Sequence, residues 1–452
     1  MNGVHPLPLW SIFTCIPLPD WFMSDSVSYH TEEREGGAHT EKPALAAPLM
    51  RLPQTSKTPR QFHIHQQAAP QSILPSRETM RLRVLPHPLV RGQDASNDTL
   101  IFPCCSRVRD RMATSDARRR LRCADYHVAW ICPIADVDLL PACLMLDEEH
   151  LTPEYDTRYD DNTYIYGTIN GHAVVVASCP QGETGNVNAG RLTGSLFKTF
   201  PNIRMTVLVG IGGGIPRSAA SESSLENVHL GDVVVGWPGD GKPPCVYYDR
   251  GKSKVNGEFE MVGTMQNPDW RLTSALSILA LDHKLRRTKF HDQLERLQGH
   301  DEFAHPGLEH DQLFEAGHRH IGPYGLGCTA CDPKQLVQRP LRTEEDKDAF
   351  VFHQGRIATG NTVIQDGELR DRIGTRCGGA LCVEMEAAGV DVNRRCLVIR
   401  GISNYADSHK NNVWQSYAAG KAAAFARELI CRLPPGTVKD MEGVNAGSNE
   451  GQ

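Results

Sequence analysis

The stretch Met205-Thr-Val-Leu-Val-Gly-Ile-Gly-Gly-Gly-Ile-Pro216 places an apolar run directly before three consecutive glycines. The run predicts a buried strand over 205–209, because unbroken apolar runs are typical of strands covered on both faces. The glycines predict either a tight turn at the strand exit or a loop whose backbone N–H groups approach a ligand. A dinucleotide-binding turn is excluded, because Pro216 and a serine-rich loop follow where a helix would have to begin.

Further apolar runs on both sides of this stretch alternate with helical patterns. The runs predict strands over 127–132, 163–166, 172–177, 231–235, 355–358, 380–383 and 396–399. Helices are predicted over 138–149, after the glycines at 182–190, and over about 415–429. The dipeptide Asn170-Gly171 predicts a hairpin turn between two of the strands. This alternation predicts an α/β fold, a three-layer α/β/α sandwich with a mostly parallel central sheet.

The composition divides the chain into segments. Residues 1–122 are rich in proline, histidine, serine and arginine and show no lasting period, so we expect a disordered N-terminal extension. Met112 opens a short basic stretch just before the globular pattern begins. We expect one domain over 123–432, with a polar surface insertion over 284–350, and a flexible tail over 433–452.

Charge and cysteine usage narrow the classes of function. The 452 residues include 48 Lys and Arg against 54 Asp and Glu, a net charge of -6, so nucleic acid is not an expected partner. No apolar run is long enough to cross a membrane, and the run over 7–18 contains prolines and lacks a preceding basic residue, unlike a signal peptide. The 14 cysteines are scattered, several within apolar runs, which predicts reduced thiols in an intracellular, cytoplasmic protein.

Two polar motifs directly follow predicted strands. The first, Val383-Glu-Met-Glu-Ala-Ala-Gly389, carries two carboxylates, which suit a ribose diol but are also typical of the first turn of a helix. The second, Arg400-Gly-Ile-Ser-Asn-Tyr-Ala-Asp-Ser-His409, has polar side chains that could otherwise cap the final helix. Because the carboxyl ends of parallel strands meet at one edge of a sheet, we expect both motifs to converge with the glycines on a ligand site.

A separate pair of cysteines has the spacing of half a zinc site. Cys328-Thr-Ala-Cys331 follows four histidines, at positions 305, 310, 318 and 320. A zinc site needs two further ligands at a suitable distance, and no second pair of this spacing exists in the chain. The pattern therefore favours reduced, structural cysteines, and we expect no metal ion.

Assembled, these motifs resemble the purine nucleoside phosphorylase / uridine phosphorylase superfamily, and among its members the fungal proteins that carry this domain ahead of ankyrin, tetratricopeptide or NTPase modules. The resemblance covers about residues 125–430. It rests on the stretches at 125–133, 145–150, 210–214, 230–235, 248–252, 358–361, 383–389 and 402–411. It implies a phosphorylase/hydrolase-like fold and a site for a purine nucleoside or nucleotide without a cofactor.

The resemblance to the nucleosidase branch also implies roles for individual residues. Glu386 corresponds to the carboxylate that holds the ribose hydroxyls, Met385 packs on the sugar, and Glu384 lies beside the sugar and water. Backbone contacts to the base fall near Val363 and Ile364. The glycine stretch, which lies near the water or phosphate, supplies Ile211, Gly212 and Gly213.

The catalytic positions depart from that branch at one residue. The general acid of the nucleosidases is an aspartate at the position of Asn404, and an amide cannot deliver a proton. The carboxylate that activates water corresponds to Asp138 or Asp136, of which we prefer Asp138. The phosphate-binding loop of the phosphorylases is absent, and Leu208 stands where hexameric phosphorylases have an arginine.

We therefore expect the domain to act on the N-glycosidic bond of a purine nucleoside, with hydrolysis favoured over phosphorolysis. Water or phosphate would be the co-substrate, and a homo-oligomer is an open alternative to a monomer. The rival hypothesis is a catalytically weakened nucleoside-binding sensor, because Asn404 replaces the catalytic aspartate.

Overall fold

The structure is a computed structural model that describes residues 118–217, 223–239, 241–346, 349–393 and 395–436. Nearly all of the predicted extension over 1–122 and most of the predicted tail over 433–452 lie outside these residues, and both stay predictions. Within the described ranges, every helix is too short or too polar to traverse a lipid bilayer.

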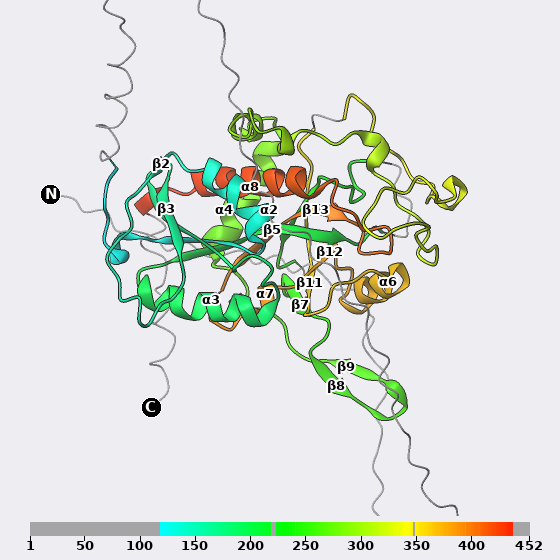
Figure 1. Ribbon diagram of the computed structural model, residues 1–452, viewed down its shortest axis with the longest axis horizontal. Coiled ribbons are helices and arrows are strands. Elements are labelled where there is room, and N and C mark those ends of the chain that lie inside the picture. Colours follow the sequence, from blue (N-terminus) through cyan, green and yellow to red (C-terminus); the bar gives the residue numbers. More distant parts are fainter. Residues whose placement is uncertain (1–117, 218–222, 240, 347–348, 394, 437–452) are drawn as a thin grey trace, which may run out of the picture. The chain divides into compact units, whose positions relative to one another are not determined.

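The strands and helices alternate along much of the chain (Figure 1). The strands are β1 (Val128–Cys132), β2 (Glu148–Glu149), β3 (Tyr164–Ile169), β4 (His172–Ser178), β5 (Met205–Gly214), β6 (Val233–Gly236), β7 (Cys245–Tyr247), β8 (Gly251–Ser253), β9 (Phe259–Met261), β10 (Phe352–Gly355), β11 (Ile357–Thr359), β12 (Cys382–Glu384) and β13 (Leu397–Asn404). The α-helices are α2 (Ala135–Leu144), α3 (Asn186–Thr199), α4 (Trp270–Lys284), α5 (Phe290–Glu295), α6 (Gly367–Arg376), α7 (Ala387–Asp391) and α8 (Gln415–Arg432).

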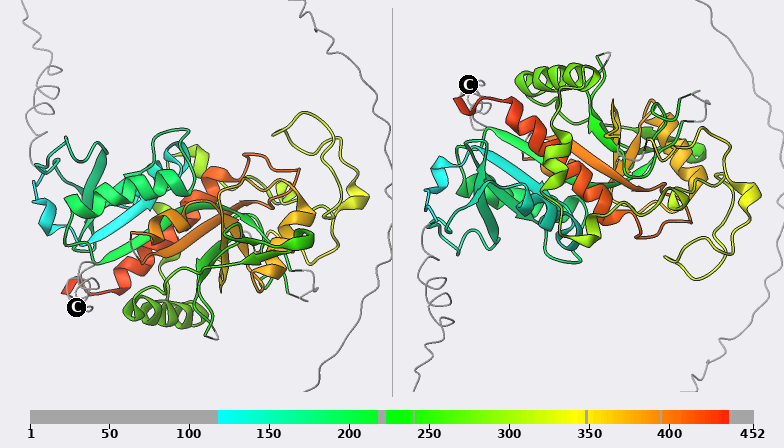
Figure 2. Two further views of the ribbon diagram at one scale, coloured as in Figure 1. Left: turned by 90° about the horizontal axis from the view of Figure 1, so that it is seen from below. Right: turned by 90° about the horizontal axis from the view of Figure 1, so that it is seen from above.

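One large sheet organises the domain. Its strands follow the order β10-β6-β13-β5-β1-β4-β3-β2, and β7, β11 and β12 continue from the far end of β5. Strand β5 runs parallel to both β1 and β13, whereas β12 pairs with it antiparallel, Val383 opposite Gly213. Helices lie on both faces of the sheet (Figure 2), so the predicted sandwich with a mostly parallel sheet is confirmed.

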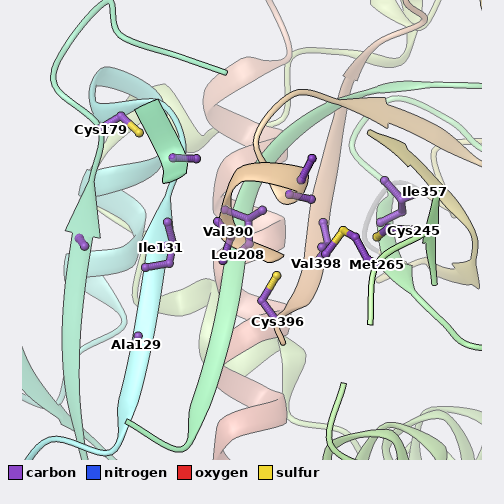
Figure 3. Packing of buried hydrophobic residues seen from close by; sticks show 14 of the residues in the cluster. Ala129, Ile131, Cys179, Leu208, Cys245, Met265, Ile357, Val390, Cys396 and Val398 are labelled. Carbon is purple, nitrogen blue, oxygen red and sulfur yellow. The ribbon is translucent and has the colours of Figure 1, made fainter. Parts of the chain in front are cut away.

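Alternate residues of β1 pack on opposite faces of the sheet, as the period of a strand requires. Val128 and Trp130 belong to the apolar cluster that contains residues of α2, α4 and α8. Ala129 and Ile131 belong to the second cluster, which contains residues of α3 and α7 (Figure 3). Burial on both faces explains why β1 reads as an unbroken apolar run in the sequence.

A two-residue hairpin turn joins β3 to β4, as the sequence predicts. Asn170 and Gly171 form the turn with φ angles of 46° and 81°. These left-handed angles suit a two-residue hairpin, and Ile169 pairs directly with His172 across it. The helix predicted over 138–149, in contrast, begins at Ala135 and ends at Leu144, so that prediction is wrong at both ends.

Two strands extend further than their apolar runs. Strand β5 continues through Gly214 and β13 continues from Ile399 to Asn404, so the glycines form neither a turn nor a loop. The glycines are needed for close packing: a Cβ at Gly213 would lie 2.9 Å from the Cβ of Ala406. The sequence-based interpretation missed this, because glycine after an apolar run can mark close approach within a strand as well as a turn.

The stretch 284–350 contributes buried residues to the domain. Phe290 of α5 stacks on Phe350 with ring centroids 3.8 Å apart, and Phe303 and Leu313 are also buried. Asp311 is held by His229 Nδ1 at 2.6 Å, which links this stretch to the residues before β6. The later part, yellow in Figure 1, passes beside the carboxyl ends of β5 and β13, where the polar motifs lie.

Candidate active site

A cavity of about 150 Å³ opens where β5, β12 and β13 meet. Nine of the ten residues predicted for the site line it: Ile211, Gly212, Gly213, Val363, Ile364, Glu384, Met385, Glu386 and Asn404. The prediction that the motifs converge is correct, although β12 reaches the site antiparallel to β5 rather than parallel. The tenth residue, Asp138, lies behind the cavity wall.

The floor of the cavity is organised by a buried arginine. Arg400 of β13 is fully buried, and its Nη2 donates hydrogen bonds to Oε2 of Glu384 and, at 3.2 Å, to Oε2 of Glu386. Its Nη1 donates to the carbonyl oxygen of Ile211 at 3.2 Å. Although burial opposes it, the two carboxylates raise the pKa of Arg400 above its ordinary value, so the side chain stays charged.

The two glutamates have different surroundings. Glu384 ends β12, and its Oε2 accepts hydrogen bonds from the backbone N–H of Glu386 at 3.0 Å and of Ala387 at 2.9 Å, which fixes the turn into α7. Glu386 accepts from the N–H of Gly185 at 3.0 Å. Burial raises the pKa of Glu386. The charge of Arg400 lowers this pKa, and the charge of Glu384 raises it further. Its carboxylate lines the cavity and has further lone pairs for ligand hydroxyls.

Asp138, in the helix α2 that follows β1, lies next to Arg400. A Cβ placed on Gly210 would lie 2.6 Å from Oδ2 of Asp138 and 3.0 Å from Nη1 of Arg400, so glycine is required for the two side chains to approach. Oδ2 accepts the N–H of Ile134 at 2.9 Å, while the buried Oδ1 has no hydrogen-bond partner within the described residues. Burial raises the pKa of Asp138 to about 7, against the Ile134 hydrogen bond and the charge of Arg400.

The geometry distinguishes Asp138 from the alternative, Asp136. Both lie in the first turn of α2, but Asp138 is buried and Asp136 is exposed. Asp138 interacts electrostatically with Arg400 and Glu386, which favours it over the exposed Asp136.

Asn404 lies at the end of β13, immediately after a bulge in the pairing with β5. Its Oδ1 accepts the N–H of Ala406 at 2.9 Å, and its Nδ2 donates to Oγ of Ser403 at 3.0 Å. The second N–H of Nδ2 is left for a ligand atom in the cavity. Asp407, the other acidic residue of this motif, lines a separate hollow with His409 and Cys328.

Sequence reasoning missed several residues of the site. Arg400 heads a predicted motif, but an arginine at the end of an apolar run gives no sign that it will be buried. Lys410 is the only cation among the cavity-lining residues of the described chain, and burial lowers its pKa. Thr184 and Gln415 complete the polar lining, from the loop before α3 and the start of α8. A lysine and a glutamine in polar stretches are typical of solvent-exposed surface, so the sequence carried no signal for them.

The family model of the Phosphorylase superfamily matches residues 136–433, and the chain therefore belongs to this superfamily. A nucleotide-binding leucine-rich repeat (NLR)-like protein of Hyaloscypha variabilis is 35% identical over 317 residues. That match covers 70% of this chain and 30% of the relative, so the chain spans less than a third of the relative's length.

The solved structures to which the chain is similar include two enzymes. One is a 5′-methylthioadenosine/S-adenosylhomocysteine nucleosidase from Neisseria meningitidis in complex with methylthio-immucillin-A, at 16% identity and a TM-score of 0.41, covering 68% of this chain and 99% of that one. The other is futalosine hydrolase of Helicobacter pylori, at 14% identity and a TM-score of 0.42, covering 68% and 98%.

Proposed function

We propose that this domain hydrolyses the N-glycosidic bond of a purine nucleoside. The observation that carries the proposal is the buried cluster under the cavity, in which Arg400 joins Glu384 and Glu386 and lies beside Asp138. A cleavage of this kind passes through a cationic sugar, and carboxylates in a buried setting stabilise positive charge that develops next to them.

The groups under the cavity suit the two halves of the reaction. Glu386 would accept hydrogen bonds from the ribose hydroxyls, with Met385 packed on the sugar. A water molecule would attack C1′, and its proton would pass through a second water molecule, beside the lining residue Ile134, to Asp138. The pKa of Asp138, about 7, suits a general base near neutral pH. The bond between C1′ and N9 breaks, and its electron pair passes to the purine.

The departing purine must then gain a proton. Asn404 cannot supply one, but its free N–H can donate a hydrogen bond to N7 or to a 6-oxo group. The proton would come from solvent or from Lys410, which lines the same cavity. Phosphate as a co-substrate would need positive charge to bind it, so a scarcity of cations supports hydrolysis over phosphorolysis. Arg400 is already paired with two carboxylates. Lys410 is the one remaining positive charge in the lining of the described cavity.

Two aspartates of α2 give a matched test of this proposal. Asp138→Asn should lower the rate of free-base release from a purine nucleoside by about 10²–10⁴-fold, because the base that activates water is lost. Asp136→Asn, two residues away and exposed, should leave the rate unchanged. Equal rates for the two variants and the wild type would remove Asp138 from the reaction.

A second candidate function is a nucleoside sensor that binds without turnover. Asn404 favours it, because the amide keeps a hydrogen bond to the base and removes the acid. The name of the Hyaloscypha relative, an NLR-like protein, also supports a role in signalling. Calorimetry with a panel of nucleosides separates the two functions: tight binding together with no free base after prolonged incubation would support the sensor.

A further inference from the structure

A cluster of cysteines and histidines lies outside the cavity, beside the loop that follows β13. Cys328 and Cys331 come from the stretch 284–350, together with His318 and His320, and His409 comes from the loop after Asn404. Ligand atoms of His320, Cys328 and Cys331 lie within 4.8 Å of one another, and so do those of His318, Cys331 and His409. Cys331 is common to both groups, so the two groups adjoin at its sulfur, although the five ligand atoms do not all lie within that distance of one another.

The distances within the cluster match those between ligands of a tetrahedral ion. Nδ1 of His320 lies 3.5 Å from Sγ of Cys331 and 3.8 Å from Sγ of Cys328. Metal–ligand lengths of about 2.3 Å for sulfur and 2.0–2.1 Å for nitrogen put neighbouring tetrahedral ligands about 3.5–3.8 Å apart. The distances from His320 to the two sulfurs are therefore those between neighbouring corners of such a site.

His409 supplies an observation that points independently to a ligand. Its side chain is buried, and neither ring nitrogen has a hydrogen-bond partner within the described residues. The ring is held in place by stacking on Phe314 at 4.1 Å between centroids, and Oδ1 of Asp407 lies 3.7 Å from its Nδ1. A buried imidazole without partners is costly, and acidic neighbours commonly orient histidines that bind metals.

We infer that Cys328, Cys331 and His320 bind one zinc ion and that the ring of His409, which adjoins Cys331, moves toward them to complete the site. A tetrahedral set of two thiolates and two imidazoles suits Zn²⁺ better than the other common divalent ions of the cell. Four protein ligands make a closed, structural site. His318, stacked on His409 at 5.4 Å, would pack beside the site. The inference replaces the expectation of no metal, which considered only residues near Cys328 in the chain.

The ion would hold the stretch 284–350 against the loop that bears Asn404. Three of its ligands come from that stretch, and the fourth lies five positions after Asn404. The same two segments already meet where the N–H of His320 donates to Oγ of Ser408 at 2.9 Å and where Tyr405 hydrogen-bonds Asp311. Zinc would thus fix the rim of the cavity and leave its floor untouched, which makes the inference independent of the proposed hydrolysis.

The direct test is the metal content of the full chain, purified after growth with added zinc and without chelators. Elemental analysis should find one zinc ion per chain in the wild type, and this zinc should be lost in the double variant Cys328→Ser with Cys331→Ser. Cys143→Ser is the control, because Cys143 is partly exposed like Cys328 and lies outside the cluster. The control should retain its zinc.

Two further measurements guard against misfolding of the double variant. His320→Cys replaces one zinc ligand by another and should keep the metal. Wild-type protein exchanged with Co²⁺ should show the absorption bands of tetrahedral thiolate coordination, and strong chelators should lower its melting temperature. Wild-type protein without zinc, zinc retained by the double variant, or a disulfide between Cys328 and Cys331 in the freshly isolated protein would each overturn the inference.

Discussion

The floor and the rim of the cavity are built from different kinds of structure. The floor is formed by residues of regular strands and the turn after β12, with Arg400 joining Glu384 and Glu386 in full burial. The rim is formed by irregular segments, the loop after β13 and the stretch 284–350, which meet near Asn404 and the cysteine–histidine cluster. In the proposed reaction, the floor would hold the sugar and the rim would treat the leaving base, so changes to the two regions should have different effects.

The largest expected effect comes from breaking the floor. Arg400→Met would leave the two glutamates buried without their cation, which should cost about 3–5 kcal/mol in the free energy of unfolding. Arg119→Met removes an arginine whose ion pair with Glu148 is exposed to solvent, with a 2.8 Å contact, and should cost less than about 1 kcal/mol. Urea unfolding of both variants measures the difference. Similar losses in the two would mean that the floor is no more critical than the surface.

The next effect tests the rim. Asn404→Asp should raise the rate of adenine-nucleoside cleavage by about 10²–10⁴-fold, because a carboxylic acid can protonate the departing base and an amide cannot. Release of free adenine, followed over time in both proteins, is the measurement. If the wild type already cleaves adenosine quickly and the variant is no faster, Asn404 is not at the acid position and the rim does not control the leaving group.

A smaller effect comes from the titration of Asp138. The general base must be unprotonated, and burial holds its pKa near 7, so kcat/KM should increase as the pH rises through about 7 and then level off. Below this pKa the rate should fall by about one decade for each pH unit. A pH profile of kcat/KM for wild-type protein tests this expectation, and a flat profile through the range would show that Asp138 carries no proton in the reaction.

The sequence predicts the fold and the position of the two glutamates of the floor because both depend on local patterns, whereas nothing in the sequence indicates that Arg400 is buried beside them. The apolar runs of β1, β5 and β13 mark buried strands, and Glu384 and Glu386 stand directly after β12 in a recognisable motif. The position of Asp138 beside Arg400 could not be derived in this way. It depends on the missing side chain of Gly210, and only the packed structure reveals why that residue must be glycine.

The rim was harder to predict for a physical reason. Cys328 and His409 are 81 positions apart, and no periodic pattern connects two irregular segments that meet only through tertiary contacts. A polar composition over 284–350 suggested a surface excursion, yet a few apolar residues such as Phe314 are buried there and bring the histidines together. Lys410 was missed for the same reason, because it belongs to an irregular loop and only tertiary contacts place it in the lining of the cavity.

The central claim is that this cavity cleaves an N-glycosidic bond with water. The most direct measurement is product analysis after incubating wild-type protein and Glu386→Ala with purine nucleosides, with and without inorganic phosphate. We expect free base and free ribose from the wild type, at a rate that phosphate does not change. We also expect that Glu386→Ala, folded but without its hydrogen bonds to the ribose, worth about 1.5–3 kcal/mol each, releases far less base. Ribose 1-phosphate as the product, or no free base from any nucleoside that binds, would contradict the claim.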